Sequence, residues 1–177
     1  MGKKTPRAPV PIMSEAELRF MAFEGLLQWA AAAIEQGRRI SACPVAGTLG
    51  HEDRRLTFAQ MRTEHHFFAI AAHKVLEHRT WVQSLGLCAA VDFSMLDQFA
   101  ATHVRDLRDM REHVVDYFKG IGWEKDRWRV DTPEFSADAS SCVGTMIGGR
   151  LDWKLFAQAC ERLLPLLLSE PIPYPPR

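Results

Sequence analysis

The sequence predicts an all-α fold: an up-and-down four-helix bundle with a small β-hairpin between the third and fourth helices. Two observations support this prediction. Four segments repeat apolar residues at steps of three and four, the spacing that gathers side chains on one face of a helix. Between the third and fourth segments, residues 128–149 lose this period and are rich in β-branched and small residues, which favours short strands.

The bundle is expected to occupy residues 14–170 as a single domain, since 177 residues suffice for one core and are too few for two. Residues 1–13 are basic and contain three prolines, so we expect a proline-rich N-terminal arm there. Residues 171–177 form a proline-rich tail. Because proline lacks the backbone N–H that a helix needs, neither end is expected to be helical.

The first two helices are bounded by capping signals and glycines. The run Ser14-Glu-Ala-Glu is a capping box, in which the serine and the second glutamate each satisfy a backbone donor of the first turn. This helix is expected to end at Gly37. Residues 38–56 show no sustained period and predict a long loop. The second helix is expected to start at Thr57 and to end before Gly86.

The third helix is expected to run unbroken from about Ser94 to Lys119, where a double glycine follows. Asp152 is expected to cap the fourth helix, which covers residues 153–169, and Pro165 should kink or shorten it. The apolar face of the third helix is predicted to consist of Phe99, His103, Leu107, Met110, Val114 and Phe118.

Composition restricts the possible partners. The 22 basic and 22 acidic residues cancel, so a nucleic-acid contact would need a local cationic patch. No apolar run is long enough to span a bilayer, and the N-terminus lacks the apolar stretch of a secretory signal. We therefore expect a cytoplasmic protein that makes no membrane contact. The four cysteines are widely spaced and are expected to be reduced thiols: Cys43, Cys88, Cys142 and Cys160.

The third helix contains the run Arg108-Asp-Met-Arg-Glu-His113. On the third helix of a small bundle, this run resembles the motif of the HEPN family, in which an arginine, four to six residues and a histidine carry ribonuclease chemistry. The resemblance implies a metal-independent RNA endonuclease of toxin or defence type, without a cofactor. In that reading Arg108 stabilises the phosphate and His113 is the general acid/base. Further phosphate or RNA contacts are assigned to Arg105, Asp109, Arg111 and Tyr117.

The spacing of the pair adds a geometric condition. Five residues along a helix differ by about 140° around its axis and by about 7.5 Å along it. Arg108 and His113 of one copy are therefore poorly placed to meet at one phosphate, and two copies across a dimer axis are expected to form the site. In the HEPN family, too, motif helices from two protomers line one cleft. Toxin members carry a tyrosine two residues after the histidine as the site of antitoxin modification; here Val115 stands there, and Tyr117 follows.

Two other functions are compatible with the sequence. The first is a non-catalytic dimeric helical bundle that acts as an interaction or regulatory protein, its charged face stabilised by pairs such as Arg108 with Glu112. An antitoxin or a regulatory protein is an expected partner of the chain. The second is a metal-dependent four-helix enzyme of the DinB type. Its ligands would come from His66, His73 and Glu77 on the second helix, with His103 and Asp106 on the third.

Overall fold

The computed structural model describes residues 13–44, 50–133 and 135–174. The arm predicted at 1–13 lies almost wholly outside the described residues, as do residues 175–177 of the predicted tail. The helices are α1 (Glu15–Ala42), α2 (His51–Ser84), α3 (Ala101–Glu112), α4 (Val114–Phe118) and α5 (Trp153–Ser169).

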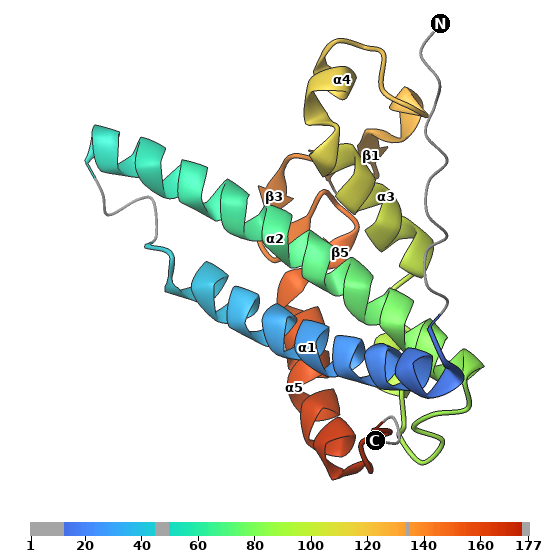
Figure 1. Ribbon diagram of the computed structural model, residues 1–177. Coiled ribbons are helices and arrows are strands. Elements are labelled where there is room, and N and C mark those ends of the chain that lie inside the picture. The colour runs from blue at the N-terminus through green and yellow to red at the C-terminus, as the bar shows by residue number, and fades with distance from the viewer. Residues whose placement is uncertain (1–12, 45–49, 134, 175–177) are drawn as a thin grey trace, which may run out of the picture.

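The fold is mostly helical, as predicted. Helices α1 and α2 form a long antiparallel pair, α3 packs on α2, and α5 packs on α1 (Figure 1). In Figure 1, α5 runs across α1 rather than alongside it. A mostly helical architecture is therefore confirmed, whereas an up-and-down four-helix bundle is not. In the described residues, no helix is both long and apolar enough to cross a membrane.

The start of α1 matches the prediction, but its end does not. The Ser14 backbone N–H donates to Glu17 Oε2 at 2.7 Å, and the Glu17 N–H donates to Ser14 Oγ at 3.3 Å, which completes the capping box. The helix continues through Gly37 to Ala42. A Cβ added at Gly37 would lie 2.8 Å from the Ala157 Cβ, so this glycine allows α1 and α5 to approach closely instead of ending the helix.

The loop predicted over residues 38–56 was therefore wrong over most of its length. Its first residues belong to α1, and α2 begins at His51 rather than at Thr57. Residues 45–49 lie outside the described part of the chain. The end of α2 at Ser84, before Gly86, agrees with the prediction.

The third helix is broken, contrary to the prediction. A 3-10 turn at Ser94–Leu96 comes first, α3 begins only at Ala101, and His113 separates α3 from α4. The Phe99 ring packs edge-on to the Phe156 ring of α5, with 4.7 Å between centroids. We infer that packing of the partly buried Phe99 and burial of Leu96 hold residues 94–99 off the helix axis, an effect that local spacing does not reveal.

Five short strands stand where one hairpin was predicted. Strands β1 (Arg129–Asp131) and β2 (Ser136–Asp138) form one hairpin, with Val130 opposite Ala137. Strands β3, β4 and β5 form a second antiparallel sheet. Their bounds are Cys142–Val143, Met146–Ile147 and Leu151–Asp152. The Asp152 side chain accepts from the Leu155 N–H at 2.9 Å, which confirms the predicted cap of α5, and the helix continues past Pro165 to Ser169.

This β region packs on α3 at a glycine. Gly148 has a φ of +57°, which favours glycine, and a Cβ there would lie 2.5 Å from Leu107 Cδ1. The β region therefore lies against the C-terminal half of α3, beside the residues of the motif. Of the predicted apolar face of α3, Leu107 and Met110 are buried, but His103 and Phe118 are exposed.

Candidate functional site

Arg108 faces α2, and its guanidinium is held by three side chains. Nη1 donates to Glu112 Oε2 at 3.1 Å, Nε lies 3.0 Å from Asp109 Oδ1, and Nη2 lies 3.1 Å from Nε2 of His73. Burial, followed by the charge of Arg108, lowers the pKa of His73 below its usual value. Since a guanidinium only donates, the neutral His73 imidazole accepts at Nε2. Arg108 is thus fixed in place, with about a quarter of its side chain exposed.

His113 lies on a different side of α3. It is the residue between α3 and α4, its side chain is 67% exposed, and its Nδ1 lies 3.9 Å from Asp116 Oδ2. It borders a cleft of about 540 Å³ together with Asp109, Tyr117 and Trp123. An exposed imidazole beside a carboxylate at the edge of a cleft has the access that proton transfer to a ligand requires.

A second hollow of about 390 Å³ adjoins this cleft and shares Asp109, Tyr117 and Trp123 with it. It adds Arg105 and, from the segment before β1, Arg127. We call the two hollows together the α3–α4 groove. Its lining residues are Arg105, Asp106, Asp109, Met110, His113, Asp116, Tyr117, Ile121, Gly122, Trp123, Glu124 and Arg127.

Aromatic rings and acidic groups dominate the groove. The Tyr117 ring stacks on Trp128 with 4.9 Å between centroids, and its hydroxyl donates to the Trp123 carbonyl at 2.5 Å. Trp123 is 83% exposed and therefore available for stacking on a ligand. Four carboxylates stand against two arginines in the lining, and Asp106 already pairs with Arg127. The groove alone is thus better suited to a base or sugar than to a phosphate, and a phosphate beside His113 would need a cation from outside the groove.

Arg111 occupies a third environment. It is only 8% exposed, donates from Nη1 to the Ala139 carbonyl at 2.8 Å, and donates from Nη2 to the Arg62 carbonyl at 3.0 Å. These bonds join α3 to α2 and to the segment after β2. Burial, followed by the nearby charge of Arg62, lowers the pKa of Arg111 to about 10.

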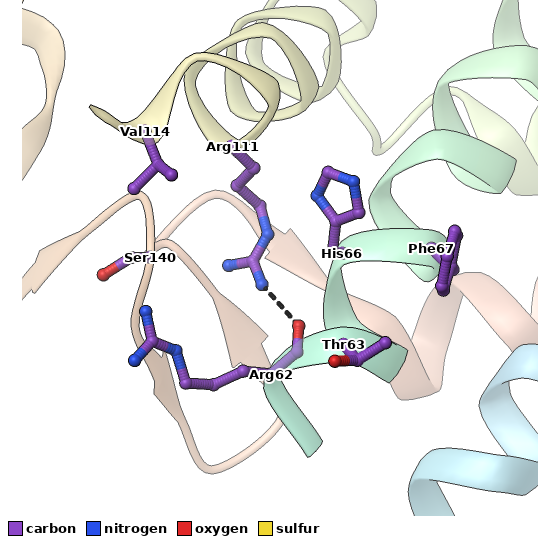
Figure 2. Close-up of a pocket in the computed structure, with 7 residues that line it drawn as sticks. All are labelled: Arg62, Thr63, His66, Phe67, Arg111, Val114 and Ser140. Atoms are coloured by element: carbon purple, nitrogen blue, oxygen red, sulfur yellow. Dashed lines mark hydrogen bonds between the residues drawn. The ribbon is translucent and has the colours of Figure 1, made fainter. Parts of the chain in front are cut away.

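Arg111 also lines a separate pocket of about 240 Å³ between α2, α3 and the β region (Figure 2). We call it the cationic pocket, because its seven lining residues include the two arginines Arg62 and Arg111 and no carboxylate. Burial, followed by the charge of Arg111, lowers the pKa of His66, which favours the neutral imidazole. The lining residues are Arg62, Thr63, His66, Phe67, Arg111, Val114 and Ser140.

The six residues assigned from the sequence therefore fall into three places. Four of them, Arg105, Asp109, His113 and Tyr117, line the α3–α4 groove, whereas Arg108 contacts α2 and Arg111 enters the cationic pocket. Arg108 and His113 of one chain share none of these hollows. Sequence reasoning missed Arg62 in the cationic pocket. Its spacing of four residues from His66 on α2 was a usable signal, but the pairing with Arg111 depends on tertiary packing.

The ligand set proposed for a metal-dependent enzyme does not assemble. In the parts of the chain that the structure describes, no three His, Cys, Asp or Glu side chains are placed to hold a metal ion. The Nε2 of His73 faces the guanidinium of Arg108, which takes the position that a cation would need. His103 is exposed on α3. Helical spacing places such side chains on one face of each helix, but it does not bring the two helices into register.

Beside Arg111, the buried His65 makes stability depend on pH. Its side chain is only 3% exposed, and burial, followed by the charge of Arg111, lowers its pKa from 6.5 to about 4. The unfolded chain therefore binds this proton at a higher pH than the folded chain does. The stability that His65 contributes is present above about pH 6.5 and is lost as the pH falls toward 4, with a total of about 3 kcal/mol.

Urea unfolding of the wild type and of His65→Leu between pH 7 and pH 4 measures this contribution. The variant replaces the titrating imidazole with an apolar side chain of similar size. We expect its unfolding free energy to fall less steeply with acid than that of the wild type. Parallel pH profiles for the two proteins would contradict the assignment.

No protein-family model, no curated protein and no solved structure matches this chain.

Proposed function

We propose that the protein is a metal-independent RNA endonuclease of the HEPN type that acts as a homodimer. In this proposal α1, α2, α3 and α5 correspond to the four helices of that family's frame, and the β region is an addition. The observation that carries the proposal is the position of His113. Its imidazole is exposed beside the Asp116 carboxylate, at the edge of a cleft that also offers Tyr117 and Trp123.

The reaction needs only groups that protein side chains supply. The 2′-oxygen of a ribose attacks the adjacent phosphorus, a new P–O bond forms, and the bond to the 5′-oxygen breaks. A general base takes the proton of the 2′-hydroxyl, and a general acid protonates the departing 5′-oxygen. A cation stabilises the charge of the phosphorane. His113 serves proton transfer, Trp123 stacks a base, and the products are a 2′,3′-cyclic phosphate and a 5′-hydroxyl.

Arg108 supplies the cation from a second copy of the chain. Within one copy it contacts His73 of α2 and does not line the cleft that His113 borders. Two α3 helices related by a twofold axis bring Arg108 of one copy toward His113 of the other, and the symmetry creates two such sites. The substrate phosphate then replaces Asp109 and Glu112 as partner of the guanidinium.

Cleavage in the presence of excess EDTA tests this function. Purified protein, incubated with a mixture of single-stranded RNAs, is expected to produce fragments that end in 2′,3′-cyclic phosphate. The control is the same RNA with 2′-O-methyl groups, which lack the attacking hydroxyl and should remain intact. RNA that stays whole under all conditions, or cleavage that requires added Mg²⁺, would contradict the proposal.

A non-catalytic interaction protein is the second candidate, and one observation favours it. Four apolar side chains on and after α4 are largely exposed, from 57% for Val115 to 83% for Trp123. Large apolar side chains exposed close together in the sequence are typical of segments that make protein contacts. Inert RNA together with binding of a regulatory protein at this surface would favour this candidate. The exposed side chains are Val115, Phe118, Ile121 and Trp123.

A further inference from the structure

Arg111 is a buried charge that no carboxylate contacts directly in the described residues, and the charge of Asp138 acts on it only from a distance. It is more than nine-tenths buried, and in the described residues its partners are two backbone carbonyls, while its Nε has no hydrogen-bond partner. Burying a cation among neutral groups is costly, because water no longer solvates the charge. An anion next to the guanidinium would remove that cost.

The neighbouring side chains increase the need for an anion. Arg62 places a second guanidinium on the same pocket, and Figure 2 shows the two arginines converging on the space beside Ser140. The charge of Arg62 acts against that of Arg111 and contributes to its lowered pKa. Two like charges on one pocket without a carboxylate repel each other unless an anion lies between them.

One further lining group is suited to hold an oxygen atom. The neutral imidazole of His66 donates through one nitrogen, whereas the hydroxyls of Thr63 and Ser140 already donate to the Ala59 carbonyl at 3.0 Å and to Asp138 Oδ1 at 2.7 Å. Arginine holds tetrahedral oxyanions through its fork of N–H groups. The volume of about 240 Å³ lies below the range of about 300–1,000 Å³ usual for drug-sized ligands, so the pocket fits one small group.

We propose that the cationic pocket is a binding site for a phosphate group, held by Arg111, Arg62 and His66, with Thr63 and Ser140 in the wall of the pocket. The site lies apart from the α3–α4 groove and does not depend on the ribonuclease activity. The phosphate has two sources, free inorganic phosphate or a phosphate of a nucleic acid strand.

Calorimetric titration with inorganic phosphate, in a phosphate-free buffer of constant ionic strength, tests the site. Arg111 also bonds the backbone of two other segments, so its variants risk unfolding the chain; Arg62→Gln and His66→Gln change exposed or half-buried side chains instead. Arg62→Gln is expected to weaken phosphate binding about tenfold or more, the loss of one charge-assisted hydrogen bond. His66→Gln should weaken it less.

Arg162→Gln is the matched control, because it removes the same charge from an exposed arginine on α5 that does not line the pocket. It should bind phosphate like the wild type, and acetate at equal ionic strength should bind more weakly than phosphate. A wild type that binds no phosphate would overturn the proposal. Equal losses in the Arg62 and Arg162 variants, or equal binding of acetate, would do the same, since both indicate nonspecific charge.

A competition with 2′-O-methyl oligonucleotides, which resist cleavage, separates the two sources. An oligonucleotide with a 5′-phosphate that displaces inorganic phosphate, while its 5′-hydroxyl form does not, identifies a strand terminus as the ligand. Displacement by both forms identifies an internal phosphate, and displacement by neither identifies free phosphate. Failure of the RNA cleavage assay leaves these outcomes unchanged, because none of them requires catalysis.

Discussion

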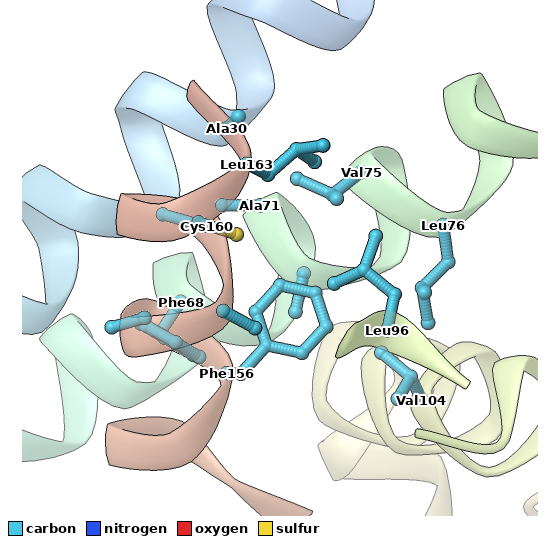
Figure 3. Close-up of a cluster of buried hydrophobic side chains, with 14 of the residues drawn as sticks. Ala30, Phe68, Ala71, Val75, Leu76, Leu96, Val104, Phe156, Cys160 and Leu163 are labelled. Carbon is cyan, nitrogen blue, oxygen red and sulfur yellow. The ribbon is translucent and has the colours of Figure 1, made fainter. Parts of the chain in front are cut away.

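Replacing Phe156 with alanine is expected to lower the free energy of unfolding by about 3–5 kcal/mol, the usual result of removing a large aromatic side chain from a packed core. Phe156 is fully buried on α5. Its ring packs edge-on to Phe68 of α2, with 6.1 Å between centroids, and to Phe99 at 4.7 Å. Figure 3 shows the ring between Phe68 and Leu96, so one side chain connects α5 to α2 and to the segment before α3.

Urea unfolding followed by circular dichroism measures the loss. Leu155→Ala is the control, since Leu155 precedes Phe156 on the same helix and is 46% exposed. It is expected to change the unfolding free energy by less than about 1 kcal/mol. A small loss for Phe156→Ala, or equal losses for both variants, would contradict the placement of α5 across the helical pair.

Replacing His113 with alanine is expected to slow RNA cleavage by about 10²- to 10⁴-fold, the contribution of a positioned general acid or base. Arg108→Ala should give a loss of similar size, because the phosphorane then lacks its cation. Neither change should unfold the protein, since His113 is two-thirds exposed and Arg108 is partly exposed at the surface of α3. Initial rates on one labelled RNA in EDTA, together with thermal unfolding, measure both effects.

His103→Ala is the matched control for this experiment. His103 is an exposed histidine on the same helix, and it lines neither the α3–α4 groove nor the cationic pocket. Its variant should cleave RNA at the wild-type rate. Equal losses in the His103 and His113 variants, or wild-type activity of His113→Ala, would remove His113 from the mechanism.

The sequence predicted the features that local chemistry determines. The capping box at Ser14 and the cap at Asp152 each require only residues within one turn, and both are present. The end of α2 before Gly86 belongs to the same class. Gly37 shows the limit of such reasoning. A glycine at this position predicts the end of a helix. In the structure, its missing side chain allows α1 to pack closely on Ala157 of α5, which is distant in sequence.

Local spacing also anticipated part of the arrangement of the candidate site. His113, Asp109 and Tyr117 were assigned from the motif and line one cleft. Spacing along a helix also indicated that Arg108 and His113 diverge, and within one chain they do contact different surfaces. The environment of Arg111 was not predictable, because Arg62 and Ala139, whose carbonyls bind its guanidinium, come from other segments of the chain.

The shared site between two copies is the central claim, and mixing two inactive variants tests it most directly. Arg108→Ala and His113→Ala are each purified, partially unfolded together and refolded, so that mixed dimers form. Random pairing makes about half of the dimers mixed, and each mixed dimer keeps one of its two sites with an intact arginine and an intact histidine. The mixture should therefore regain about a quarter of the wild-type cleavage rate. A mixture no more active than its separate components would contradict the shared site.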